Sequence, residues 1–141
     1  MKAGGFSMSD SHAATIQVTY EPDIDAMLVT IQGRAALDDY RKALSALIHA
    51  EGFHSKMNTI WDLRKADMRE LSVENILDIV TLSVNSAGQR GPAWTAAVVV
   101  EGYHGFRVGR MLEMLTDDAP YRMAVFRTVQ EAEQWMKQEV A

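Results

Sequence analysis

The sequence contains no cysteine, few prolines and no long apolar run. Without cysteine it can form no disulfide, no thiolate metal site and no cysteine nucleophile. Its longest wholly apolar segment, AAVVV at 96–100, is too short to cross a bilayer. The first residues, MKAGGFSMSDSHAA, carry one lysine and lack the long apolar core of a signal peptide. We therefore expect a cytoplasmic protein with no membrane span.

Positive charge is also scarce, with 14 Lys and Arg against 19 Asp and Glu and a net charge of -5. The basic residues are scattered, whereas a nucleic-acid surface needs them clustered. None of the four histidines shows the i, i+4 pairing of a helical zinc site. No glycine-rich phosphate loop and no Gly-x-Ser-x-Gly elbow follows a predicted strand. We therefore predict no catalytic residue, no metal and no cofactor.

The hydrophobic period changes repeatedly along the chain. Small and polar residues fill positions 1–13, and we predict a flexible tail there, followed by a single domain over 14–141. Strand periodicity appears at 15–20, 26–33, 58–63, 93–100 and 121–126, and helical periodicity at 36–50, 72–84, 105–118 and from 128 onward. This order predicts an α/β fold in which an N-terminal β-hairpin precedes alternating helices and strands, with a five-stranded, mostly parallel mixed sheet and about four helices.

The last predicted helix begins at a capping box. Thr128 can accept a hydrogen bond from the amide of Glu131, whose carboxylate can reach back to the Thr128 amide. One broad face of this helix then carries Val129, Ala132, Trp135, Met136 and Val140. We therefore interpret Trp135 as an anchor in the core rather than a stacking platform for a ligand.

Two segments, WDLRKADMRELSVENIL at 61–77 and RMLEMLTDDAPYRMAVFRTVQEAEQWM at 110–136, resemble the bacterial SpoIIAA-like family, which is related to STAS domains. In that family a strand ends in Trp/Leu-Asp-Leu/Arg, and the last strand ends in Val-Phe-Arg before a helix of the form Glu-Ala-x-x-Trp. The resemblance extends from residue 15 onward and implies a four-helix, five-stranded domain. Relatives are anti-sigma factor antagonists or are similar to CRAL-TRIO lipid-binding domains.

The resemblance also implies one candidate modification site. In the antagonists, a loop of the form Asp-Ser-Ser/Thr-Gly is phosphorylated on a hydroxyl at the start of a helix. The matching segment here, RELSV at 69–73, lacks the Asp and the Gly and has Ser72 as its one hydroxyl. Glu70 and Glu74 would repel a phosphate, although a helix N-terminus attracts one. Ser72 is therefore a phosphorylation candidate, and we favour its interpretation as an N-cap.

Asp62 ends a predicted strand at the edge where α/β sheets tend to place ligands, and Arg34 and Glu101 follow other strands. Asp62 is a candidate polar site residue at this sheet edge. The alternative, which we favour, is that its carboxylate accepts hydrogen bonds from its own loop.

The segment 105–118 has a core face and an outer face. The core face is expected to comprise Val108, Met111, Leu112 and Leu115, with Gly105 and Gly109 allowing close packing. The outer face should expose Phe106 and Met114 among Arg107 and Arg110. These four residues form either a contact patch or an apolar surface covered by arginine stems.

The segment 72–84 is apolar over an unusually wide arc. Its expected core stripe comprises Val73, Ile76, Leu77, Val80 and Val84. Ile79 and Leu82 then extend the apolar surface outward. Two partly apolar outer faces predict self-association, most simply as a dimer.

The function predicted from these observations is a non-enzymatic regulatory or protein-interaction module that resembles anti-sigma factor antagonist and STAS domains. The alternative is a carrier of an apolar or lipid-like small molecule, as the similarity to CRAL-TRIO domains implies. Adaptable methionines favour the carrier slightly, since the nine include Met111, Met114 and Met123. A carrier needs a cavity of several hundred cubic ångströms, whereas an interaction module can have a filled core.

Overall fold

The computed structural model describes residues 14–54, 57–69, 71–90, 95–118 and 122–140. The expected tail over 1–13 lies outside the described residues. Along the chain the elements are β1 (Thr15–Glu21), β2 (Ala26–Arg34), α1 (Leu37–Ile48), β3 (Asn58–Asp62), β4 (Ala66–Asp67), α2 (Val73–Arg90), β5 (Thr95–Val99), α3 (Gly102–Leu115), β6 (Arg122–Phe126) and α4 (Val129–Val140).

The strands form one mixed sheet in the order β1-β2-β3-β5-β6. The hairpin pair β1 and β2 is antiparallel, and every other pairing is parallel, as predicted. One addition was not predicted: the short strand β4 pairs in parallel with the end of β2, opposite Gly33 and Arg34. Two residues carry no readable hydrophobic period, so this strand leaves no signal in the sequence.

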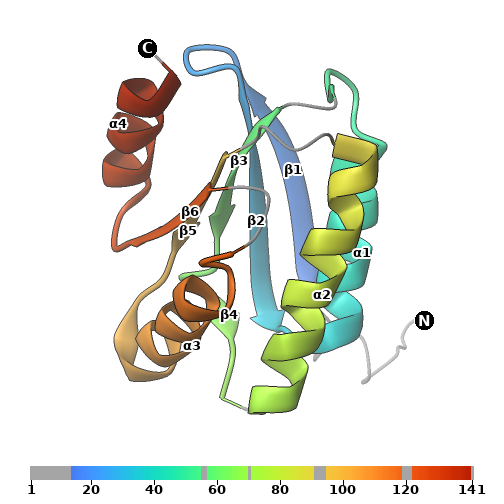
Figure 1. The fold of residues 1–141 in the computed structure, drawn as a ribbon, viewed down its shortest axis with the longest axis vertical. Helices are drawn as coiled ribbons and strands as arrows, with labels where there is room; N and C mark the ends of the chain where they lie inside the picture. The colour runs from blue at the N-terminus through green and yellow to red at the C-terminus, as the bar shows by residue number, and fades with distance from the viewer. Residues whose placement is uncertain (1–13, 55–56, 70, 91–94, 119–121, 141) are drawn as a thin grey trace, which may run out of the picture.

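Helices cover both faces of the sheet, with α1, α2 and α3 on one side and α4 on the other (Figure 1). Alternate residues of β2 divide between the two layers, since Met27 and Val29 join the larger core and Ala26 joins the smaller one. The smaller core is completed by α4, where Ala132 and Met136 are fully buried. The result is a three-layer α/β fold.

The α4 helix packs as its sequence predicted. The Trp135 ring lies 5.3 Å from the Phe126 ring, at an angle of 46°. The Thr128 hydroxyl accepts from the Glu131 amide at 3.1 Å. In one detail the predicted capping box is wrong, because the Glu131 carboxylate accepts from the Thr128 hydroxyl at 3.3 Å rather than from the Thr128 amide.

The helix α3 begins at Gly102 rather than at residue 105, because Gly102 adopts a φ of 76° that glycine tolerates and so turns the chain early. It lies close to the sheet through Gly109, where an added Cβ would be 2.9 Å from Cγ1 of Val125. Val108 and Leu112 are buried as expected, but Leu115 is 38% exposed because the helix ends there. Gly105 and Gly109 both permit close packing, as expected. Their neighbours are Val100, Met68 and Val125, which belong to the sheet and the segments that follow its strands rather than to another helix.

Candidate functional site

The outer side of α3 carries a continuous stripe of large side chains. Tyr103, Arg107, Arg110 and Met114 follow one another at spacings of four, three and four residues, which places them on one helical face. We call these four residues the α3 face. Tyr103 is 78% exposed and Met114 is 76% exposed. Sequence reasoning missed Tyr103, because it started the helix at residue 105.

Two arginines flank these exposed side chains, and they are held differently. Arg107 is half-buried and donates from Nη2 to the carbonyl oxygen of Leu71 at 3.0 Å, which fixes α3 to the loop before α2. The Arg110 side chain is 78% exposed and lies 3.4 Å from Glu113. An exposed ion pair of this kind contributes little free energy, so Arg110 can exchange Glu113 for another carboxylate.

Phe106 was expected to point outward, and the structure places it only partly at the surface. It is half-buried against the larger core, and the guanidinium of Arg127 lies over its ring, 4.9 Å from the centroid. The reason is the position of Phe106 at the edge of α3 nearest β6, where the chain leaving β6 covers it. Phe106, Arg110 and Arg127 line an open surface groove of about 420 Å³ that extends to Glu131 on α4.

The outward extension predicted for α2 is wrong for Ile79 and holds in part for Leu82. Ile79 is 8% exposed and Leu82 is half-buried, whereas Val73 and Leu77 are 55% and 44% exposed. The side chain of Val84 lies outside the described part of the chain. The sequence of α2 is apolar over more than half of its circumference, so its pattern does not determine which arc faces inward. Packing against α1, α3 and the sheet selects the arc centred on Ile76 and Ile79.

An internal pocket lies between these helices and the sheet. Its volume is about 60 Å³, well below the roughly 300 Å³ at which ligand pockets usually begin. Its wall includes Tyr40 and Leu44 of α1, Ile79 and Leu82 of α2, Trp61 of β3 and Leu112 of α3. Ile79 therefore belongs to the interior of the molecule, whereas Leu82 lies between this pocket and the outer surface.

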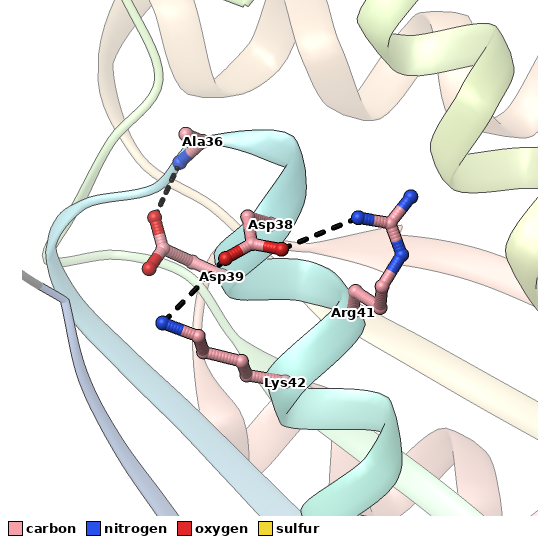
Figure 2. Close-up of polar contacts among 5 residues, drawn as sticks. All are labelled: Ala36, Asp38, Asp39, Arg41 and Lys42. Carbon is pink, nitrogen blue, oxygen red and sulfur yellow. Dashed lines mark hydrogen bonds and ion pairs between the residues drawn. The ribbon is translucent and has the colours of Figure 1, made fainter.

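Polar contacts hold the start of α1, immediately before Tyr40, whose side chain lines this pocket. The Ala36 amide donates to Oδ2 of Asp39 at 2.8 Å, while Asp38 lies 3.2 Å from Arg41 and 3.5 Å from Lys42 (Figure 2). Tyr40 follows directly and is 6% exposed. Within the described part of the chain its hydroxyl has no hydrogen-bond partner. Burial, and then the charge of Asp39, raise the pKa of Tyr40, so the hydroxyl keeps its proton as a donor.

At the carboxyl edge of the sheet, Asp62 is occupied by its own loop. It accepts from the backbone amide of Arg64 at 3.2 Å and from two guanidinium nitrogens of the same residue, each at 2.9 Å. Burial acts to raise the pKa of Asp62, but the bonds from Arg64 outweigh it and hold that pKa below its ordinary value. The favoured interpretation of Asp62 as an acceptor within its loop agrees with this geometry.

The same arrangement occurs a second time, at Asp67. Arg69 donates to this carboxylate from its amide at 3.1 Å and from its guanidinium at 3.0 and 2.8 Å, and lowers the pKa of Asp67 to about 2. Both pairs follow an Asp-x-Arg pattern that is visible in the sequence. Over the ranges that the structure describes, no three His, Asp or Glu residues converge in a way that could hold a metal ion. The edge therefore presents ionised, paired carboxylates.

Ser72 caps α2. Its hydroxyl accepts from the amide of Asn75 at 3.0 Å, and its own amide donates to Oδ1 of Asn75 at 3.1 Å. The N-cap predicted from sequence is therefore present, with Asn75 completing the reciprocal pair. Phosphorylation of Ser72 stays a prediction of the resemblance, and a phosphate on this oxygen would have to replace the capping bond.

No protein-family model and no curated protein matches the sequence. The structure is similar to the crystal structure of an uncharacterized protein of the DUF3478 family with a SpoIIAA-like fold from Shewanella loihica PV-4. The TM-score is 0.57 and the sequence identity is 16%, over 95% of this chain and 99% of that chain. The chain therefore has a SpoIIAA-like fold, which confirms the fold implied by its sequence. Of the described helices, none combines the length and the apolar character needed to cross a membrane.

Proposed function

From the SpoIIAA-like fold and the exposed side of α3, we propose that this protein is a non-enzymatic regulatory module that acts by binding protein. Its contact surface is the α3 face, comprising Tyr103, Arg107, Arg110 and Met114. The observation that carries the proposal is the exposure of Tyr103 and Met114, at 78% and 76%, on one side of a well-packed helix.

The chemistry of the α3 face supports this role. Tyrosine, methionine and arginine are enriched at protein interfaces, and tyrosine and arginine supply many of the side chains that dominate binding energy. The helix that displays them is held rigidly, because Gly109 packs on Val125 and Arg107 is bonded to Leu71. A rigid surface loses less conformational entropy when it binds.

Other features of the chain favour binding of a protein over catalysis or transport. Asp62 and Asp67 at the sheet edge are both engaged by arginines, which leaves them poorly suited to proton transfer. The internal pocket, at about 60 Å³, is too small for a lipid chain. Both observations support an interaction module over an enzyme or a lipid carrier.

The simplest partner is a second copy of the chain. Glu113 lies 3.4 Å from Arg110 beside the α3 face, so a twofold contact can pair Arg110 of one copy with Glu113 of the other. Dimers with twofold symmetry are the commonest homo-oligomers. We therefore propose a homodimer that uses the α3 face.

Light scattering coupled to size-exclusion chromatography, over a range of protein concentrations, tests this proposal. We expect the wild-type protein to dimerise and Met114→Glu to shift it to the monomer, because the new carboxylate would be desolvated in the contact. Leu77→Glu is the matched control, since it places the same charge at an exposed apolar site on α2 and should leave the dimer intact.

A monomeric wild-type protein would redirect the test to other proteins. Immobilised wild-type and Met114→Glu proteins would then be compared for capture of proteins from bacterial lysate. A protein retained by the wild type and by Leu77→Glu but lost by Met114→Glu would support the module. A monomer that retains no such protein would contradict the proposed function.

A further inference from the structure

The hydroxyl of Tyr40 is an exception to a general rule of protein interiors. Buried side-chain polar atoms nearly always have a hydrogen-bond partner, and each one that lacks a partner needs an explanation. Tyr40 is 6% exposed, and among the described residues no acceptor lies within reach of its hydroxyl. Phenylalanine would fill the same space without this cost, so the hydroxyl points to a group that the described residues do not supply.

The other donors in the pocket wall are already bonded. Two further hydroxyls belong to Ser83 and Thr116, which donate to the carbonyl oxygens of Ile79 at 3.1 Å and Leu112 at 2.6 Å. The indole nitrogen of Trp61 donates to Thr59 at 3.2 Å. Within the described residues, Tyr40 is thus the donor in this wall that still lacks an acceptor.

Apart from these hydroxyls and the indole nitrogen, the wall is mostly apolar. A buried water usually makes about three hydrogen bonds, and Ser83 and Thr116 already donate to carbonyl oxygens, so a water at Tyr40 would have only their remaining lone pairs as further side-chain partners in this wall. A mostly apolar molecule with one acceptor oxygen matches both the wall and the hydroxyl. The apolar lining includes Leu44, Trp61, Val80, Val98, Leu112 and Met123.

The pocket also has a route of entry. Leu44 and Leu82 line both the internal pocket and an open groove of about 330 Å³ over α1 and α2. The side chains of Leu44 and Leu82 lie between the pocket and the groove. Because leucine side chains change rotamer rapidly, these two can open a path for a ligand. At about 60 Å³ the pocket is smaller than the roughly 150 Å³ engineered cavity that binds benzene, so even a small ring enters only when side chains of the wall rearrange. Rearrangement of Leu44, Leu82 or the flexible Met123 would enlarge the space.

We propose that this pocket is a binding site for a small, mostly apolar molecule with one carbonyl or ether oxygen, which accepts a hydrogen bond from the Tyr40 hydroxyl and enters between Leu44 and Leu82. The site is separate from the α3 face and goes beyond the proposed protein-binding role. Its ligand is defined by shape and by a single acceptor, not by charge.

A pair of matched probes tests the site on the full chain. Cyclopentanone and methylenecyclopentane have the same shape, but only the ketone offers a strong acceptor. In a two-dimensional NMR titration, we expect the ketone to cause saturable shifts at the amides of Tyr40, Ile79 and Val98. In Tyr40→Phe its affinity should fall about tenfold, which corresponds to the loss of one hydrogen bond. Methylenecyclopentane should bind the wild type and Tyr40→Phe equally.

Tyr20→Phe is the control, because it removes the hydroxyl of an exposed tyrosine that donates to Asp25 at 2.8 Å. It should leave the affinity for the ketone unchanged. The proposal is overturned if the ketone causes no saturable shift at the pocket, or if the ketone binds Tyr40→Phe as tightly as the wild type. The ratio of the two affinities, ketone to alkene, should be higher for the wild type than for Tyr40→Phe, because this comparison cancels the larger dehydration cost of the ketone.

Discussion

Burial of a polar side chain has opposite effects on the stability of the protein at Asp62 and at Tyr40. Asp62 is surrounded by donors from Arg64, so its charge is compensated where it lies. Tyr40 is more deeply buried and has no acceptor among the residues that the structure describes. A buried unpaired polar group costs about 1 to 3 kcal/mol. The first side chain therefore stabilises its loop, and the second destabilises the ligand-free protein.

Tyr40→Phe should accordingly raise the free energy of unfolding in the absence of ligand. The expected gain is about 1 kcal/mol, because the ring still packs while the unpaired hydroxyl is gone. Urea denaturation of both proteins measures it. Tyr20→Phe should show no gain, since that hydroxyl is exposed and bonded. A loss of stability in Tyr40→Phe would mean that the hydroxyl has a partner in solution.

Asp62→Asn should lower the free energy of unfolding at neutral pH by about 1 kcal/mol, a value reduced for the partial exposure of Arg64. The pKa of Asp62 in the folded protein lies below its ordinary value, so the unfolded chain takes up the proton first as the pH falls. The contribution of the Asp62 carboxylate to the free energy of unfolding is fully present above about pH 5. It is lost as the pH drops through the pKa that Asp62 has in the folded protein.

Urea denaturation of wild type and Asp62→Asn between neutral and acid pH tests this dependence. The two stabilities should converge in acid. Asp38→Asn serves as the control, since its partners Arg41 and Lys42 are exposed and contribute little. A difference for Asp62→Asn that persists unchanged in acid would contradict the role of the Asp62 charge.

At the scale of elements, the position of α3 depends on its glycines and on its first residue. Gly105 and Gly109 are visible in the sequence as a pair four residues apart, and their role in close packing follows from the lack of a side chain. The start of the helix is not visible in the same way, because Gly102 turns the chain before the hydrophobic period begins. The exposed stripe of the α3 face depends on that starting point.

Gly109→Ala should lower the free energy of unfolding by about 1 to 3 kcal/mol, because its Cβ would lie 2.9 Å from Cγ1 of Val125 and would force α3 away from β6. Thermal or urea denaturation measures the loss. Gly102→Ala tests backbone strain without a steric clash. Nothing lies within 4 Å of an added Cβ at this position, so any loss of stability would come from its φ of 76°. Equal stability of Gly109→Ala and wild type would show that α3 lies farther from the sheet.

At the scale of the whole molecule, the α3 face and the Tyr40 pocket are separate, so each can be tested without changing the other. The α3 face points away from the core, whereas the Tyr40 pocket lies between α1, α2, α3 and the sheet. Met114→Glu should therefore change the free energy of unfolding of the monomer by less than about 0.5 kcal/mol while it disrupts assembly. Denaturation at low protein concentration checks this expectation, and a large destabilisation would show that Met114 packs within its own chain.

The sequence by itself determined the α/β class, the strand order along the chain, the caps at Ser72 and Thr128 and the core role of Trp135. These depend on local periods of 2.0 and 3.6 residues and on short-range hydrogen bonds, which act between neighbours in the chain. The Asp-x-Arg pairs at Asp62 and Asp67 are local in the same sense, and their spacing could have revealed them.

Only the tertiary structure decided which arc of α2 faces inward, that Arg127 covers Phe106, and that Tyr40 is buried with no partner among the described residues. Each of these depends on residues far apart in the sequence that meet in space. A helix that is apolar on most sides can pack in several rotations with similar hydrophobic gain, and neighbouring elements choose among them. For the same reason, the Tyr40 pocket, which lies where several elements meet, could not be predicted from local pattern, while the elements themselves could.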